Sequence, residues 1–198
     1  MRGKSFWRAA IYLPNIISAV ALANMWIHYA YNANWGLFHN IFAALGWDSM
    51  AQFQWTSPDH LFLAMMVAYC FGAVGYYMLI YIAEIEKIPQ DIFEAAKIDG
   101  ANSAVTLFRI TLPMIKDTII FTTLLRAIWT FNAVDLIVSL TDGGPNRGTT
   151  TLALYIMNTF TGSYDYGYAS ALAVISTLIM MVVAFVYIRF GKMGQTDN

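Results

Sequence analysis

The residue types that commonly carry out catalysis do not combine into a catalytic set in this chain. His28, His39 and His60 are scattered without the spacing of metal ligands, and no Ser, His and Asp set can be argued from the sequence. The phosphate-cradling pattern G-x-x-x-x-G-K-[ST] is absent, and Gly143 and Gly144 precede a proline, which indicates a turn. We therefore expect no catalytic residue, no metal site and no cofactor in this chain.

One stretch of mixed charge, residues 94–113 with the sequence EAAKIDGANSAVTLFRITLP, lies between long apolar runs. Its residue types suit recognition of a partner. Pro89 suits the first turn of a helix, and Asp91 and Glu94 place negative charge near the positive end of that helix. Gly100 is a fitting terminator in the left-handed conformation. The pattern predicts a helix of about three turns that ends at Gly100.

A second short helix is predicted directly after Gly100. Asn102 or Ser103 can cap its start, and Pro113 is expected to stop it. The apolar residues of both helices need cover, and the charged residues of both helices cannot lie in hydrocarbon. The apolar residues are Ile92, Phe93, Leu107, Phe108 and Ile110, and the charged ones are Glu94, Lys97, Asp99 and Arg109. We expect this helix-turn-helix to bind a soluble partner.

The rest of the chain has the composition of an integral membrane protein. Hydrophobic residues make up 59% and charged residues 12%, against about a quarter charged in soluble proteins, and the mean hydropathy is +0.54. A membrane-spanning helix needs about 20 apolar residues. We expect one all-α membrane domain with spans at 9–29, 61–82, 119–140 and 168–188, and the charged loop at 84–117. Pro14 would fall in the first turns of the first span.

The positions of lysine and arginine predict the orientation, because cytoplasmic loops retain positive charge. Basic residues cluster before the first segment, between the second and third, and after the fourth: Arg2, Lys4 and Arg8; Lys87, Lys97, Arg109 and Lys116; Arg189 and Lys192. Both termini and the charged loop should therefore be cytoplasmic. Residues 31–60 and 141–167 should face outward, with Arg147 as the exception.

The first outward segment combines aromatic residues with a helical spacing of apolar ones. Leu37, Phe38, Ile41, Phe42 and Leu45 predict a short helix in the membrane interface. The accompanying tryptophans are typical of an aromatic belt, and docking of a partner is the alternative. The single cysteine, Cys70, is expected to be a small buried apolar residue.

Two ionisable residues fall within the third span. Nine residues at about 100° each place Arg126 and Asp135 on opposite faces of one helix, so they should not pair. Arg126 could reach the interface or contact a partner helix. Asp135 shares a face with Phe131 and Asn132, and these three could line a substrate path, although Asp135 as a structural acceptor near the outer interface is an equal alternative.

Several of these stretches resemble the permease subunits of bacterial ATP-binding cassette (ABC) importers. Their cytoplasmic EAA motif reads EAA, three residues, G, nine residues, I, one residue, LP, and it is matched here by Glu94, Ala95, Ala96, Gly100, Ile110, Leu112 and Pro113. The maltose and glycerol-3-phosphate permeases carry segments similar to three more stretches: YLPNIIS at 12–18, FNAVDLIVSLTDGGP at 131–145 and YGYASAL at 166–172. The resemblance covers nearly the whole chain.

The resemblance implies a type I ABC importer permease fold and a mechanism for sugar import. The EAA loop would form a coupling helix in a cleft of a cytoplasmic ATPase dimer, which binds the ATP and Mg. Glu94 would pair with a basic group there, Ala95 and Ala96 would permit close packing, and Gly100 would make the turn. An extracytoplasmic sugar-binding protein and a second, homologous permease would be the other partners, in the bacterial inner membrane and with no role for nucleic acid.

The family usually has six spans, with the EAA loop between the fourth and the fifth. The chain matches the last four, so we expect it to lack the first two and to be a truncated gene product or a fragment. Two other functions stay open: an ATPase-independent secondary transporter or channel subunit, and a structural membrane subunit that does not line the path. The sequence does not identify the sugar.

Overall fold

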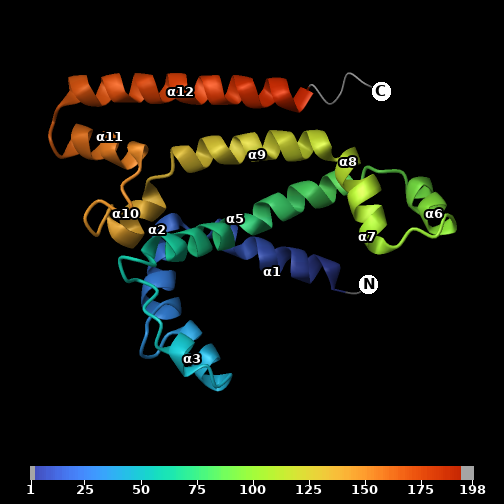
Figure 1. Cartoon of the computed structure of the whole chain (residues 1–198), viewed down its shortest axis with the longest axis horizontal. Coiled ribbons are helices and arrows are strands. Elements are labelled where there is room, and N and C mark those ends of the chain that lie inside the picture. The colour runs from blue at the N-terminus through green and yellow to red at the C-terminus, as the bar shows by residue number, and fades with distance from the viewer. Residues whose placement is uncertain (1–2, 193–198) are drawn as a thin grey trace. The chain divides into compact units, whose positions relative to one another are not determined.

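The computed structural model describes residues 3–192, and within this range the chain is helical without a strand (Figure 1). The all-α prediction is confirmed. Within the described part, the chain divides into two compact units. The first unit contains residues 3–75 and 131–176, and the second contains residues 76–130 and 177–192.

The first apolar segment is broken into two arms, which corrects the expectation of a helix over 9–29. Helix α1 (Lys4–Ile16) is followed by α2 (Ala19–Asn24) and a π-helical turn, η1 (Met25–Ala30), and the two arms meet at an angle of 98°. The Ser18 hydroxyl starts the second arm by accepting a hydrogen bond from the Ala21 N–H at 3.3 Å. Pro14 lies near the end of α1, not in its first turn.

Helix α5 (Leu61–Ile85) packs against α1 inside the first unit through backbone contacts. A Cβ atom added at Gly75 would lie 2.6 Å from the Tyr12 Cα, so no larger residue fits there. The Asn15 side-chain amide donates to the Gly72 carbonyl at 3.1 Å. Small residues allow such close approach of helices in a membrane. Cys70, expected to be buried, is exposed on α5 in the isolated chain.

An aromatic cluster closes the core of the first unit. The Tyr31 ring lies 5.0 Å from Trp26 and 5.8 Å from Trp55, measured between ring centroids, and its hydroxyl donates to the Ala64 carbonyl at 2.5 Å. Helix α3 (Leu37–Ala44) adds Phe38 to the cluster, and the short α4 (Asp48–Ala51) follows. The predicted short helix after residue 36 is thus confirmed.

The third apolar segment is interrupted, which corrects the expectation of a helix over 119–140. Helix α9 (Lys116–Phe131) ends before a break at 132–134, and α10 (Asp135–Thr141) begins after it. In the second unit, α9 lies beside α5: the Tyr81 and Thr122 hydroxyls are 2.8 Å apart, and the Tyr76 and Trp129 rings are 5.7 Å apart. In the first unit, α10 packs against α2 (Figure 1).

The chain ends with α11 (Leu152–Thr161) and the long α12 (Tyr166–Lys192). Among the described residues, α5 and α12 are each long and apolar enough to cross a membrane, and the two broken pairs qualify only if each counts as one span. Of the most apolar stretch of α12, only 6% is buried within the chain. A helix that is apolar and exposed requires lipid or another membrane helix around it.

Candidate functional site

The charged loop begins with α6 (Gln90–Ile98), whose end has the geometry predicted for it. Gly100 adopts a φ of +77°, its N–H donates to the Lys97 carbonyl at 3.1 Å, and the Ala101 N–H donates to the Ala96 carbonyl at 2.9 Å. These two bonds form a Schellman motif, which requires a left-handed residue at this position. Pro89 occupies the N-cap position immediately before the helix, not the first turn.

The second helix of the loop starts as predicted and ends later than predicted. The Asn102 side chain accepts a hydrogen bond from the Val105 N–H at 2.8 Å, which makes Asn102 the cap. Helix α7 (Ser103–Thr106) continues through a π-helical turn, η2 (Leu107–Thr111), into α8 (Leu112–Met114). Pro113 therefore does not stop the helix. The wide π turn changes the hydrogen-bond register just before Pro113, so its ring and missing N–H are tolerated.

The two alanines of the loop point in different directions. Glu94 and Ala95 are exposed, whereas Ala96 is buried within the isolated chain. Ala96 is therefore occupied by packing inside the loop, and Ala95 is the alanine that a partner could reach. The motif by itself predicted close packing with the partner for both alanines.

Each helix of the charged loop exposes a large apolar side chain. Ile98 is 87% exposed and Phe108 is 67% exposed. Ile98 was missed in the sequence analysis, although its spacing of four residues from Glu94 and three from Ala95 places it on the same helix face. Of the remaining predicted loop residues, Ile110 and Leu112 are half-buried and Pro113 is exposed. Figure 1 shows α6 and α7 in the second unit, where α5 ends and α9 begins.

The three residues predicted to line a path lie at the break after α9. Phe131 is half-buried at the end of α9, while Asn132 and Asp135 are exposed. Asp135 occupies the first turn of α10, where the positive end of a helix favours a carboxylate. The structure brings these residues to one short stretch, and their contact with a substrate remains a prediction.

Arg126 and Asp135 belong to different helices, so the prediction that they lie on opposite faces of one helix is wrong. The break at 132–134 separates α9 from α10. The Arg126 guanidinium lies 5.8 Å from the centre of the Tyr77 ring on α5. A cation–π contact of this kind gives the charge a partner within the second unit. Arg126 thus contacts a helix of its own chain.

The chain matches the family described as "Binding-protein-dependent transport system inner membrane component" over residues 2–192. It belongs to this family. The match extends through both compact units and includes the charged loop. Family members are membrane transport components, which accounts for the exposed apolar helices of this chain.

Three curated relatives from this family are sugar permeases by name. The trehalose/maltose transport system permease protein MalF of Thermococcus litoralis is 31% identical over 97% of this chain and 64% of its own length. The diacetylchitobiose uptake system permease protein NgcF of Streptomyces coelicolor is 31% identical over 100% of this chain and 57% of its own length. The sulfoquinovosyl glycerol transport system permease protein SmoG of Agrobacterium fabrum is 33% identical over 87% of this chain and 54% of its own length. The chain spans less than two thirds of the length of these relatives.

Two solved structures share the fold. The first is a bacterial alginate ABC transporter in complex with a periplasmic protein that binds an alginate pentasaccharide. One of its chains matches this chain with a TM-score of 0.83 and 22% identity, over 97% of this chain and 66% of its own length. A bacterial ABC transporter involved in alginate import matches with a TM-score of 0.80 and 21% identity, over 100% of this chain and 69% of its own. The fold is therefore that of a type I ABC importer permease.

Proposed function

We propose that this chain forms part of the membrane-spanning permease of an ATP-driven, binding-protein-dependent sugar importer. The observation that carries the proposal is the surface of α6, where Glu94, Ala95 and Ile98 are exposed on one face of a helix ended by a well-defined turn. A surface of this kind in a membrane protein needs a soluble partner. The sugar permeases among its relatives support the choice of cargo.

The soluble partner we propose is a cytoplasmic ATPase dimer, which would bind ATP and Mg and carry out the hydrolysis. Glu94 would pair with a basic group of the ATPase, and Ala95 would allow α6 to enter a narrow cleft. Ile98 and Phe108 supply apolar area that such a cleft would cover. This chain itself would have no catalytic residue and no cofactor.

The remaining partners would lie in the membrane and on its outer side. A second, homologous permease would cover part of the exposed apolar surface of α12, and lipid would cover the rest. A sugar-binding protein would dock on the outer side, where residues 31–60 and 141–167 face if the termini are cytoplasmic.

We assign the sugar path to the break between α9 and α10. A membrane helix tolerates irregular backbone only where it is buried in protein or lines a cavity, and broken helices are common at transport sites. Phe131, Asn132 and Asp135 flank this break, and their aromatic, amide and carboxylate groups would contact the sugar.

Removal of the phosphate-binding lysine from the ATPase subunit should abolish sugar uptake. The measurement is uptake of radiolabelled sugar into vesicles that contain the complete transporter, its binding protein and ATP. The proposal requires a loss to the level of vesicles without ATP, because transport has no other energy source. Uptake that persists would instead favour a secondary transporter or channel.

The two alanines of α6 should respond differently to enlargement. Ala95→Leu should leave the free energy of unfolding within about 0.5 kcal/mol of the original, since the side chain is exposed, but should reduce ATP-driven uptake at least about tenfold because the helix no longer fits its cleft. Ala96→Leu should lower the free energy of unfolding by about 1–3 kcal/mol, because the site is buried.

Thermal unfolding of both variants and their ATPase stimulation by the binding protein would test this difference. Equal loss of stability in the two variants would contradict the assignment of Ala96 to internal packing. Full uptake by a stably folded Ala95→Leu variant would contradict the proposed coupling surface.

A further inference from the structure

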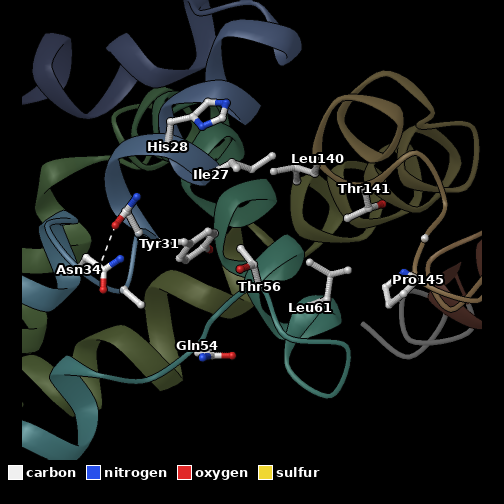
Figure 2. Close-up of a pocket in the computed structure, with 13 residues that line it drawn as sticks. Ile27, His28, Tyr31, Asn34, Gln54, Thr56, Leu61, Leu140, Thr141 and Pro145 are labelled. Atoms are coloured by element: carbon white, nitrogen blue, oxygen red, sulfur yellow. Dashed lines mark hydrogen bonds between the residues drawn. The ribbon is translucent and has the colours of Figure 1, made fainter.

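A second feature of the molecule is a cavity of about 720 Å³ in the first unit. It lies where η1 and the loop after it face the segment before α5 and the turn after α10 (Figure 2). Its volume falls within the range of about 300–1,000 Å³ that is usual for sites of small ligands. None of the three residues assigned to the sugar path lines it.

The cavity wall is polar, and none of the described residues that line it carries a carboxylate, ammonium or guanidinium group. Its amide, hydroxyl and imidazole side chains come from His28, Tyr31, Asn32, Asn34, Gln54, Thr56 and Thr141. Within residues 3–192, the side chains of Asn34, Gln54 and Thr56 have no hydrogen-bond partner in the chain. They are therefore available to a ligand that both donates and accepts hydrogen bonds.

Other polar groups of the wall are held in place by the fold. The Asn32 side-chain oxygen accepts hydrogen bonds from the N–H groups of Asn34 at 3.0 Å and Trp35 at 3.3 Å. The Thr141 and Thr149 hydroxyls are 2.7 Å apart, and the Tyr31 hydroxyl is bound to the Ala64 carbonyl. These groups form a fixed part of the wall, whereas the exposed side chains of Asn34, Gln54 and Thr56 would lose conformational entropy when a ligand binds.

Apolar side chains of the wall lie among its hydroxyl groups, with Thr56 next to Leu61 and Thr141 next to Leu140 (Figure 2). Leu61 and Leu140 are half-buried and line the cavity together with Pro145 (Figure 2). A ligand that fits this wall presents both hydroxyl groups and C–H groups, without charge. Saccharide rings have this combination, because their hydroxyls project at the ring edge and their C–H groups lie on its faces.

We propose that this cavity binds a neutral saccharide on the outer side of the membrane, before the sugar reaches the path at the break after α9. The choice of a saccharide and of the outer side rests on the proposed function. Thr141 lies six positions after Asp135 on α10, a helical rise of about 9 Å. The cavity and the path therefore lie at opposite ends of α10, and the cavity is a separate site along the same route.

Photolabelling of the complete transporter in lipid nanodiscs, without the binding protein, would test the site. The probes are diazirine derivatives of maltose, lactose and diacetylchitobiose, and labelled peptides are identified by mass spectrometry. At least one of these three probes should label the peptides that contain residues 54–61 and 140–145. An excess of the corresponding unmodified sugar should prevent this labelling. The corresponding derivative of digalacturonic acid, which is charged, should label these peptides at least about tenfold less.

A matched pair of variants makes the test specific. Gln54→Leu combined with Thr56→Val should reduce labelling of these peptides at least about tenfold, since two hydrogen bonds to the sugar are lost. Gln52→Leu should leave labelling within about twofold, because Gln52 is exposed two residues away and does not line the cavity. Equal labelling of these peptides in the double variant and in Gln52→Leu would overturn the proposal.

Uptake of the same sugars by this transporter in proteoliposomes, with its binding protein and ATP, separates the two levels of inference. A transporter that imports a neutral saccharide but is not labelled at these peptides overturns the cavity assignment alone. A transporter that imports no neutral saccharide overturns the proposed function, and the choice of ligand for the cavity with it.

Discussion

Replacing Gly75 by alanine should separate α1 from α5 and destabilise the first unit. The added Cβ would overlap the Ile11 carbonyl oxygen and would lie 2.6 Å from the Tyr12 Cα and 2.9 Å from the Ile11 carbonyl carbon. These neighbours are backbone atoms, so no side-chain rotation can relieve the overlap. We expect a loss of about 3 kcal/mol, the upper part of the range for overpacking, and a fall in Tm of about 6–12 °C for a chain of this size.

Thermal unfolding in detergent, followed by tryptophan fluorescence, measures this effect. Gly167→Ala is the matched control, because a Cβ at Gly167 would lie 3.9 Å from the Asp165 Oδ1, which is an ordinary van der Waals contact. Alanine is a better helix former than glycine, so the control should keep or slightly raise the Tm. A Tm for Gly75→Ala equal to that of the control would show that α1 and α5 do not meet at this glycine.

Replacing Gly100 by valine should abolish transport while the outer surface continues to bind the sugar-binding protein. The space around Gly100 is open, with no atom within 4 Å of an added Cβ, but its φ is +77°. The penalty is therefore backbone strain alone, about 1–2 kcal/mol or more for a β-branched residue. Release of this strain would unwind the turn that sets α7 relative to α6, and the coupling surface of the proposed function would be lost.

Gly100→Asn separates this strain from the mere presence of a side chain. Asparagine tolerates the left-handed conformation, so this variant should retain at least about half of the uptake. ATP-driven uptake in proteoliposomes and binding of the sugar-binding protein are measured for both variants. Full transport by Gly100→Val, or equal loss in both variants, would contradict a role for the left-handed turn in coupling.

The two helices of the charged loop and the turn between them could be predicted from the sequence because their signals are local. A Schellman turn involves residues five apart, so Gly100 after a helical stretch is sufficient to indicate it. Asn102 caps the second helix through the N–H three residues later, which is equally local. The continuation through Pro113 was missed because the π turn before it has no pattern in the residue types.

The breaks in the apolar segments could not be predicted from hydropathy. Ser18 and the stretch 132–134 lie in runs whose composition also suits a straight span, and hydropathy counts residues without regard to direction. Ser18 begins a new helix because its hydroxyl caps it, and the arm that follows can pack Leu22 and Trp26 into the core beside α5. No local pattern of residue types predicts the free energy gained by that packing.

The sequence by itself determined the helical class, the membrane character, the family and the turn at Gly100, because composition, motif spacing and capping act within a few residues. Only the tertiary structure decided that Ala95 is exposed and Ala96 buried, that Arg126 faces Tyr77 on α5, and that polar side chains near residues 32, 54 and 141 share one cavity. These features depend on contacts between segments far apart in the chain. Which side of a helix is covered, and by what, follows from packing.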